Sequence, residues 1–272
     1  VALYSMHTNL DNSYDGLNKY VAEKLGLFDI KILAPKQDYL KKIVTYCPTN
    51  YVTQVREALF NAGAGHIGNY DNCSFNSKGS GTFRALEGSN PFTGNINETF
   101  TGDEIKIETV FPAYLENKIL KALFNSHPYE EVAYDIYKLS NKFDKAGSGV
   151  SGSFEKPYNE NNFIEHLKKI FNIPFIRHNK MIGRKIQNIS LCTGSGSFLI
   201  NNAINNNSDA FITADLKYHN FTDAGNKIFL TDCGHFETEI FAKEIIRDIL
   251  IKKFPNFAVL ISKNEINPVN YS

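Results

Sequence analysis

The spacing of apolar residues at the start of the chain predicts a strand followed by a helix. Residues 1–6 are mostly apolar and fit a short strand. Apolar residues then recur one helical turn apart, at Leu17, Val21 and Leu25, so we predict a helix over 14–27. A glycine close to the end of that segment is a typical helix stop.

The next segment, 38–140, follows the order strand, helix, strand, strand, helix, strand. A stretch rich in Gly, Ser and Asn between its second and third strands predicts a flexible loop. This order is that of the ferredoxin-like plan. The predicted elements are a strand at 41–48, a helix at 49–65, strands around 65–75 and 102–112, a helix at 113–127 and a strand at 130–139.

From a second flexible stretch at 141–154 to the end of the chain, predicted helices and strands alternate. Strands such as "NISLCTG" and "IFLTDC" have the continuous apolar character of strands covered on both faces by helices. The predicted elements are a helix at 162–171, strands at 174–177 and 187–192, a helix at 198–205, a strand at 209–213, a helix at 218–226, a strand at 228–232, a helix at 237–254 and a strand at 257–262.

These patterns predict one α/β domain interrupted by a smaller one. The strand predicted at 1–6 has the character of the strands after residue 141, and the intervening segment separates it from them. We therefore predict a mixed-sheet α/β domain formed by 1–36 and 141–272, with a ferredoxin-like insertion at 37–140.

The charge and cysteine content of the chain disfavour several classes of partner. Lys plus Arg and Asp plus Glu number 29 each, so no basic excess favours nucleic acid or an anionic membrane. The longest apolar stretches have the length of strands, too short for a membrane-spanning helix. The four cysteines form no C-x-x-C pair, which indicates a reduced, cytoplasmic protein.

A histidine and a glutamate stand one helical turn apart in the stretch "CGHFETE". His235 and Glu239 would share a helix face directly after a predicted strand. An imidazole with a carboxylate is a ligand set for Zn, Fe or Mn. Taken alone, the spacing favours an ordinary helix start, because acidic residues are common there.

Other predicted strand ends also carry polar side chains, and ligands of α/β sheets gather at such ends. In "HTNLD", Asp11 suits a carboxylate ligand and His7 suits a ligand, a group that orients Asp11 or a proton carrier. Turn formation is the other interpretation of this stretch. In "ADLKYH", Asp215 or His219 could carry protons, while Asp215 could equally cap a helix.

The stretch "TGSGS" lies between a predicted strand and a predicted helix. The backbone N–H groups of Gly194, Ser195 and Gly196 could cradle a phosphate there. A tight turn without a ligand explains the same residues at least as well, because G-x-G alone is a weak signal.

Two histidines of the predicted insertion have structural interpretations. We expect His127 to lie at the C-terminal end of a helix, where its ring meets the negative end of the dipole. We expect His66 to lie at the entry of a strand.

Together, these motifs resemble one family closely. They are "HTNLD" with "GLNKYVAEKLGL", "GAGHIGNYDNCSF", "GSGSFLI", "ADLKYHNFTDAG" and "DCGHFETE". The family is the Nif-three-like dinuclear-metal family, also described as the GTP cyclohydrolase I type 2 homologues. The resemblance covers essentially the whole chain and is to the longer bacterial form, in which a PII-type, CutA-like domain interrupts the metal domain.

The resemblance implies that Asp11, His235 and Glu239 bind two divalent metal ions (Zn, Fe or Mn), with Glu239 as a candidate bridge between them. Members of the family also use a pair of histidines from an upstream "HHP"-type motif, and this chain has no adjacent His pair. We expect those ligands to lie upstream of the chain, which would then hold metal poorly or only in part. The resemblance also implies a toroidal homohexamer.

Two functions follow from the resemblance. One is a metal-dependent hydrolase that acts on a nucleotide or a phosphorylated small molecule, with His219 or His7 as proton carrier. The alternative is a non-enzymatic protein that binds or handles metal, in which the insertion gates access or senses a small ligand.

Overall fold

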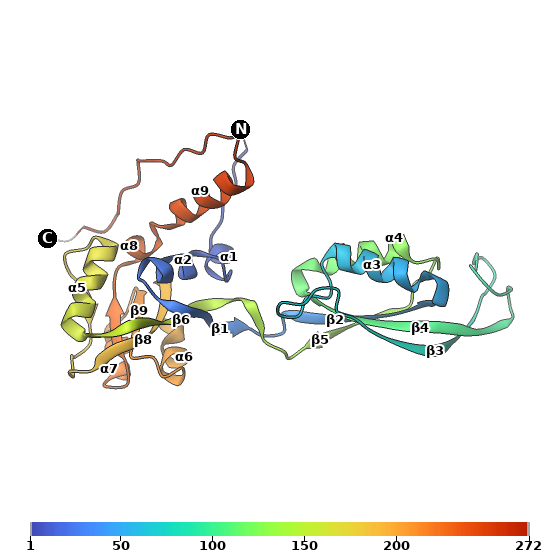
Figure 1. The fold of residues 1–272 in the computed structure, drawn as a ribbon, viewed down its shortest axis with the longest axis horizontal. Helices are drawn as coiled ribbons and strands as arrows, with labels where there is room; N and C mark the ends of the chain where they lie inside the picture. Colours follow the sequence, from blue (N-terminus) through green and yellow to red (C-terminus); the bar gives the residue numbers. More distant parts are fainter. Residues whose placement is uncertain (1, 271–272) are drawn as a thin grey trace. The chain divides into compact units, whose positions relative to one another are not determined.

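The computed structural model describes residues 2–270, which divide into two compact units. Unit 1 runs to Lys36 and resumes at Asp144, and unit 2 is Gln37–Phe143. Each unit contains one β-sheet with helices packed on it (Figure 1). The chain therefore has a mixed α/β fold with two sheets. The sequence predicts an insertion at 37–140, and the second compact unit of the structure is Gln37–Phe143.

The sheet of unit 1 has six strands in the order β1-β6-β8-β9-β10-β7. Strands β8, β9 and β10 are parallel to one another, whereas β6 and β7 pair antiparallel with β8 and β10. The sheet is therefore mixed, as the sequence predicts. The strands are β1 (Phe28–Lys36), β6 (Phe143–Asn159), β7 (Arg177–His178), β8 (Lys185–Ser195), β9 (Ala210–Ala214) and β10 (Phe229–Asp232).

Helices cover both faces of this sheet, because the side chains of its central strands alternate between two apolar clusters. In β9, Ile212 belongs to the cluster that includes α2 and α5, and Phe211 belongs to the cluster that includes α6 and α7. All five residues of β9 are buried. The helices of unit 1 are α1 (Thr8–Asp11), α2 (Leu17–Lys24), α5 (Glu160–Phe171), α6 (Ile200–Asn205), α7 (Tyr218–Ala224), α8 (His235–Glu239) and α9 (Ala242–Lys253).

Unit 2 has an antiparallel sheet in the order β3-β4-β2-β5 and two helices that pack on it through one apolar cluster. Figure 1 shows α3 and α4 side by side on the same face of the sheet. The order strand, helix, strand, strand, helix, strand is as the sequence predicts. The elements are β2 (Leu40–Pro48), α3 (Val52–Ala62), β3 (Phe75–Arg84), β4 (Thr99–Pro112), α4 (Glu116–Ser126) and β5 (Tyr134–Leu139).

The prediction of a strand at the start of the chain is wrong for the described residues 2–6. These residues form no strand and are exposed, and Leu3 is 96% exposed. An apolar run becomes a strand only where a neighbouring strand completes its hydrogen bonds, and none pairs with 2–6. Asp11 consequently lies in the short helix α1 and not in a loop that leaves a strand. The first strand of unit 1 is instead β1, which the sequence interpretation missed.

Parts of two stretches predicted to be flexible are strands in the structure, whereas 85–98, between β3 and β4, belongs to neither strand. The Gly- and Ser-rich residues of β3 pair with β4 over ten positions, and 141–154 lies largely within β6, next to β8. Glycine disfavours a strand locally, but ladder hydrogen bonds to a neighbour outweigh that preference. The predicted strand at 65–75 is correspondingly misplaced, because β3 begins at Phe75.

The C-terminal region also differs from the prediction. The helix predicted over 237–254 is divided into α8 and α9, and 257–262 forms no strand. Among residues 2–270, no helix is both long enough and apolar enough to cross a membrane.

The side chain of the buried Asn179, directly after β7, contacts both the loop that precedes β10 and β10 itself. Its Nδ2 donates to the carbonyls of Gly225 (2.8 Å) and Ile228 (2.9 Å), and its Oδ1 accepts from the N–H of Leu230 (2.9 Å). One side chain thus satisfies three backbone groups at the edge of the sheet.

We predict that Asn179→Asp destabilises the protein by about 1–3 kcal/mol, because the carboxylate places an acceptor against two carbonyls. Urea unfolding followed by circular dichroism measures this change. The control is Asn201→Asp on the exposed side of α6, which should leave the midpoint nearly unchanged. Equal midpoints for the two variants would contradict the role given to Asn179.

Candidate metal centre

The carboxyl ends of the parallel strands β8, β9 and β10 meet at one edge of the unit 1 sheet. Gly194 lies at the end of β8, Asp215 directly follows β9, and His235 begins α8 after β10. The sequence placed its candidate residues at strand ends, and the structure brings these three to the same edge.

His235 is held between two carboxylates. Its Nδ1 lies 2.6 Å from Asp215 Oδ2, and its Nε2 lies 3.2 Å from Glu239 Oε2. The second pair spans one turn of α8, as the spacing in the sequence predicts. A histidine that donates its Nδ1 proton to a carboxylate presents the lone pair of its Nε2, which is the arrangement found around metal-binding histidines.

The backbone of Asp215 is in the left-handed region, with φ of +55°. Non-glycine residues adopt this conformation rarely, although Asp tolerates it better than most. The following N–H, of Leu216, donates to Asp232 Oδ2 at 3.0 Å. Asp215 is therefore a turn residue whose side chain points at His235, and neither the proton-carrier nor the helix-cap interpretation describes this contact.

The buried Asp232 carboxylate fixes the two turns that carry Asp215 and His235. Besides Leu216 N–H, it accepts from Gly234 N–H at 3.2 Å and from Arg177 Nη1 at 3.1 Å. Arg177 also donates to the Leu216 carbonyl at 2.9 Å. The side chain of Asp232 is only 6% exposed, so its charge is balanced by these donors rather than by water.

Asp11 is positioned through the buried Asn18. Asn18 Nδ2 donates to the Asp11 carbonyl at 2.9 Å, and its Oδ1 accepts from the N–H of Thr193 in β8 at 2.8 Å. Burial and the charge of Glu239 raise the pKa of Asp11, while His7 and His235 act to lower it. The pKa of Asp11 is therefore sensitive to the charges of both His235 and Glu239.

The pKa of His235 is also shifted. Burial of the ring acts to lower it, but the hydrogen bond to Asp215 and the charges of Glu239 and Asp215 together outweigh burial and raise it. Acidic side chains around His235 therefore favour a bound cation, whether a proton or a metal ion.

The backbone of Gly194 lies directly beside Glu239 and His235. Its φ is +60°, and a side chain there would collide with Glu239 Oε1 and approach His235 Nε2 to 3.2 Å. Its N–H donates to Thr238 Oγ1, and its carbonyl accepts from Thr213 Oγ1. The phosphate cradle over Gly194, Ser195 and Gly196 stays a prediction, but the Gly194 N–H already has an acceptor.

The two histidines proposed as proton carriers have different surroundings. His7 precedes α1, its Nδ1 lies 3.1 Å from Thr8 Oγ1, and its charge affects Asp11. His219 is exposed on α7, where its ring packs edge-on against Tyr218. Within residues 2–270, His219 makes no hydrogen bond, ion pair or ring contact with the cluster around His235.

The chemical types of these side chains suit a divalent cation, but too few of them converge to hold one. A neutral imidazole nitrogen and two carboxylates suit Zn, Fe or Mn. Burial, with the nearby charges of Asp11 and Glu239, raises the pKa of the adjacent Cys192 to about 12, so its thiol is not a ready ligand. In the part of the chain that the structure describes, no three His, Cys, Asp or Glu side chains converge closely enough to hold an ion as they stand.

Comparison with known proteins identifies close relatives. A protein of Halalkalibacterium halodurans named GTP cyclohydrolase 1 type 2 homolog is 37% identical over 276 residues, which cover 100% of this chain and 74% of that protein. A Bacillus subtilis protein of the same name is 35% identical over 277 residues, with the same coverage.

Solved structures of related proteins resemble this chain over nearly its whole length. The crystal structure of a Bacillus cereus protein related to NIF3 matches with a TM-score of 0.84 and 34% identity, over 100% of this chain and 74% of the other. A Staphylococcus aureus protein matches with a TM-score of 0.72 and 28% identity, over 99% and 72%. The mixed α/β fold with two sheets is therefore shared with a NIF3-related protein.

The family described as Duf34/NIF3 (NGG1p interacting factor 3) matches residues 1–268 of the chain. This match agrees with the relatives and confirms the resemblance that the sequence motifs indicated. The chain belongs to the Duf34/NIF3 family.

Proposed function

We propose that unit 1 binds divalent metal through His235, Glu239 and Asp11. The observation that carries the proposal is the position of His235, whose two ring nitrogens face Asp215 and Glu239 at 2.6 and 3.2 Å. A histidine fixed in this way has one nitrogen oriented by a carboxylate and the other available to a cation beside a second carboxylate.

The full centre would hold two divalent ions (Zn, Fe or Mn) through Asp11, His235 and Glu239 together with further ligands. Ions held there would supply Lewis acidity toward a phosphoryl or ring C=N group. Within the chain, Asp215 orients the His235 ring, Asn18 holds the segment that carries Asp11, and Gly194 leaves room for the Glu239 carboxylate. Within residues 2–270, no three potential ligands converge, and His235 Nε2 and Glu239 Oε2 are the pair that meets at 3.2 Å, so such a centre needs further ligands.

The proposed reaction is metal-dependent hydrolysis of a nucleotide or a phosphorylated small molecule. The names of the relatives, GTP cyclohydrolase 1 type 2 homolog, support a nucleotide as the first substrate class to test. His7, near Asp11, is better placed than His219 to carry a proton within the cluster.

The alternative proposal is a non-enzymatic protein that binds or handles metal. One observation bears on it: of the two histidines proposed as proton carriers, the exposed His219 packs against Tyr218 and not against the cluster around His235 in residues 2–270. The homohexamer and the cytoplasmic location stay predictions, and light scattering in solution tests the first.

We propose that unit 2 is a ferredoxin-like domain of the CutA and PII kind. Its support is the antiparallel strand order β3-β4-β2-β5 with both helices packed through one apolar cluster. The strands nearest to each other in sequence, β3 and β4, form one edge pair, and the first and last strands of the unit form the other.

We predict that His235→Ala and Asp11→Ala each lower the metal content of the purified protein, because each removes a donor. Elemental analysis measures the content. The matched control is Glu237→Ala, since Glu237 lies in the same helix but bonds to Asn267. Unchanged metal content in both test variants would refute the assignment of the centre.

We predict that Asp215→Asn weakens metal binding roughly 10–100-fold at neutral pH, because the ring loses its orienting carboxylate. The same change shifts the pH dependence. Metal binding requires neutral His235 and therefore declines as the pH falls through its pKa. Since Asp215 contributes to raising that pKa, its removal should move the midpoint to lower pH.

Metal titrations between about pH 5 and pH 8 measure both effects. A midpoint that stays in place or rises in Asp215→Asn would contradict the electrostatic coupling of these two side chains.

We predict that Glu239→Gln removes metal-dependent hydrolysis from protein supplied with Zn, Fe or Mn. A panel of nucleotides and phosphoesters, with GTP included, measures the activity, and Glu237→Gln serves as the control. Hydrolysis that depends on metal but survives in Glu239→Gln would place the chemistry elsewhere. No hydrolysis by the unmutated protein loaded with metal would favour the non-enzymatic alternative.

A further inference from the structure

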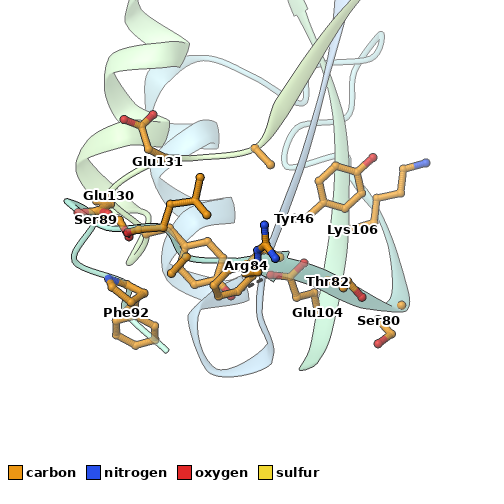
Figure 2. A pocket seen from close by; sticks show the side chains of 18 of the residues that line it. Tyr46, Ser80, Thr82, Arg84, Ser89, Phe92, Glu104, Lys106, Glu130 and Glu131 are labelled. Carbon is orange, nitrogen blue, oxygen red and sulfur yellow. Dashed lines mark hydrogen bonds between the residues drawn. The ribbon is translucent and has the colours of Figure 1, made fainter. Parts of the chain in front are cut away.

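Unit 2 contains a cavity of ≈ 630 Å³ that belongs to no site described above. Its walls come from β3, from the loop that follows β3 and from the segment after α4. Figure 2 shows Arg84 and Glu104 near the middle of the labelled side chains, with Ser89, Phe92 and Glu130 to one side. Pockets of this volume typically hold small organic ligands.

Glycines open the wall of the cavity that β3 provides. Gly79 pairs with Glu104 of β4, and Gly81 pairs with Gly102. A side chain on Gly81 would collide with Glu104 Oε2, so the glycine makes room for that carboxylate. The first part of the stretch that the sequence predicts to be a flexible loop is thus a strand, β3, whose small residues leave space beside it.

Aromatic rings form another part of the lining. The ring of Tyr129 lies 6.1 Å from that of Phe83 and 6.0 Å from that of Phe92, centroid to centroid. Its neighbour His127, at the C-terminal end of α4 as predicted, packs edge-on against it at 5.0 Å and bonds to the Tyr46 carbonyl. The Tyr129 ring is therefore fixed before any ligand arrives.

Glu104 lies against these rings with capacity to accept more hydrogen bonds. The Tyr129 hydroxyl donates to its Oε1 at 2.8 Å. In the described part of the chain, no basic side chain forms an ion pair with Glu104 and no hydrogen bond reaches its Oε2. The nearest lysine along the strand, Lys106, pairs with Glu108 at 3.3 Å instead.

We propose that this cavity binds a flat nitrogen heterocycle with neighbouring N–H donors, of the guanine kind. The ring would lie against Phe83 and Phe92, since aromatic side chains stack on the face of any such base. The Glu104 carboxylate would accept the neighbouring N–H groups, because a carboxylate takes two parallel N–H donors at once. Arg84, which also lines the cavity, is placed to meet a phosphate when the heterocycle belongs to a nucleotide.

The charge of the lining favours a neutral ring over an organic cation. Three acidic residues (Glu104, Glu130, Glu131) and three basic residues (Lys78, Arg84, Lys106) line the cavity, so the formal charges of its lining balance. An aromatic cage for an ammonium ion would gain from an excess of negative charge, which this lining lacks.

The test is isothermal titration of the full chain, kept free of metal with a chelator, against guanosine, inosine and adenosine. We expect guanosine to bind more tightly than inosine, which lacks the 2-amino donor, and adenosine to bind least. Glu104→Gln should weaken guanosine binding about tenfold or more, through loss of the charged acceptor. Asp103→Asn, on the same strand but outside the lining, is the matched control and should bind as the unmutated chain does.

Two further variants separate the parts of the ligand. Phe92→Ala, in an exposed loop, should weaken guanosine and inosine alike, through loss of stacking. Arg84→Gln should weaken guanosine monophosphate but not guanosine, if the ligand is a nucleotide. Equal binding of both by the unmutated chain would identify the nucleoside or base as the ligand.

The proposal is overturned if neither guanosine nor its monophosphate binds at about 1 mM. It is also overturned if binding survives unchanged in both Glu104→Gln and Phe92→Ala, or if spermidine binds in preference to guanosine. Since the protein carries no metal in this experiment, failure here leaves the proposed metal centre untouched.

Discussion

The candidate centre depends on one buried carboxylate. Asp232 accepts hydrogen bonds from the backbone of two turns, at Leu216 and Gly234, and its charge is matched by Arg177. Those turns hold Asp215 and His235, so a single group sets the distance between the histidine and the carboxylate that orients it. A charge buried to this degree is tolerated only with all of its donors present, which makes the arrangement rigid.

The sequence predicts the fold best where local preference and tertiary packing agree. The helix that contains Leu17 and the buried strands β8, β9 and β10 have periodic apolar residues, and the structure has them near the expected positions. Prediction from sequence fails where pairing with a neighbouring strand determines whether a segment becomes a strand. Residues 2–6 have strand-like composition without a neighbour, whereas the glycine-rich β3 gains a strand conformation from ten pairings with β4.

For the candidate centre, the sequence indicates the side chains that could act but not those that position them. His235 and Glu239 stand at a spacing that a helix brings together, and the structure confirms that contact. Asn18 and Asp232 give no such signal, because their hydrogen bonds reach residues 175 and 16 positions away in the chain. Only the order of the strands in the sheet could have shown which segments these two side chains connect.

The place where unit 2 interrupts unit 1 has a consequence for the evolution of the chain. The chain leaves unit 1 after β1 and re-enters it at β6, and these two strands are neighbours in the six-stranded sheet. The whole of 37–143 thus occupies the position of a turn between adjacent strands. Exchanging it for a short turn would break no strand pairing of that sheet, so a complete second domain could be gained or lost there as a unit.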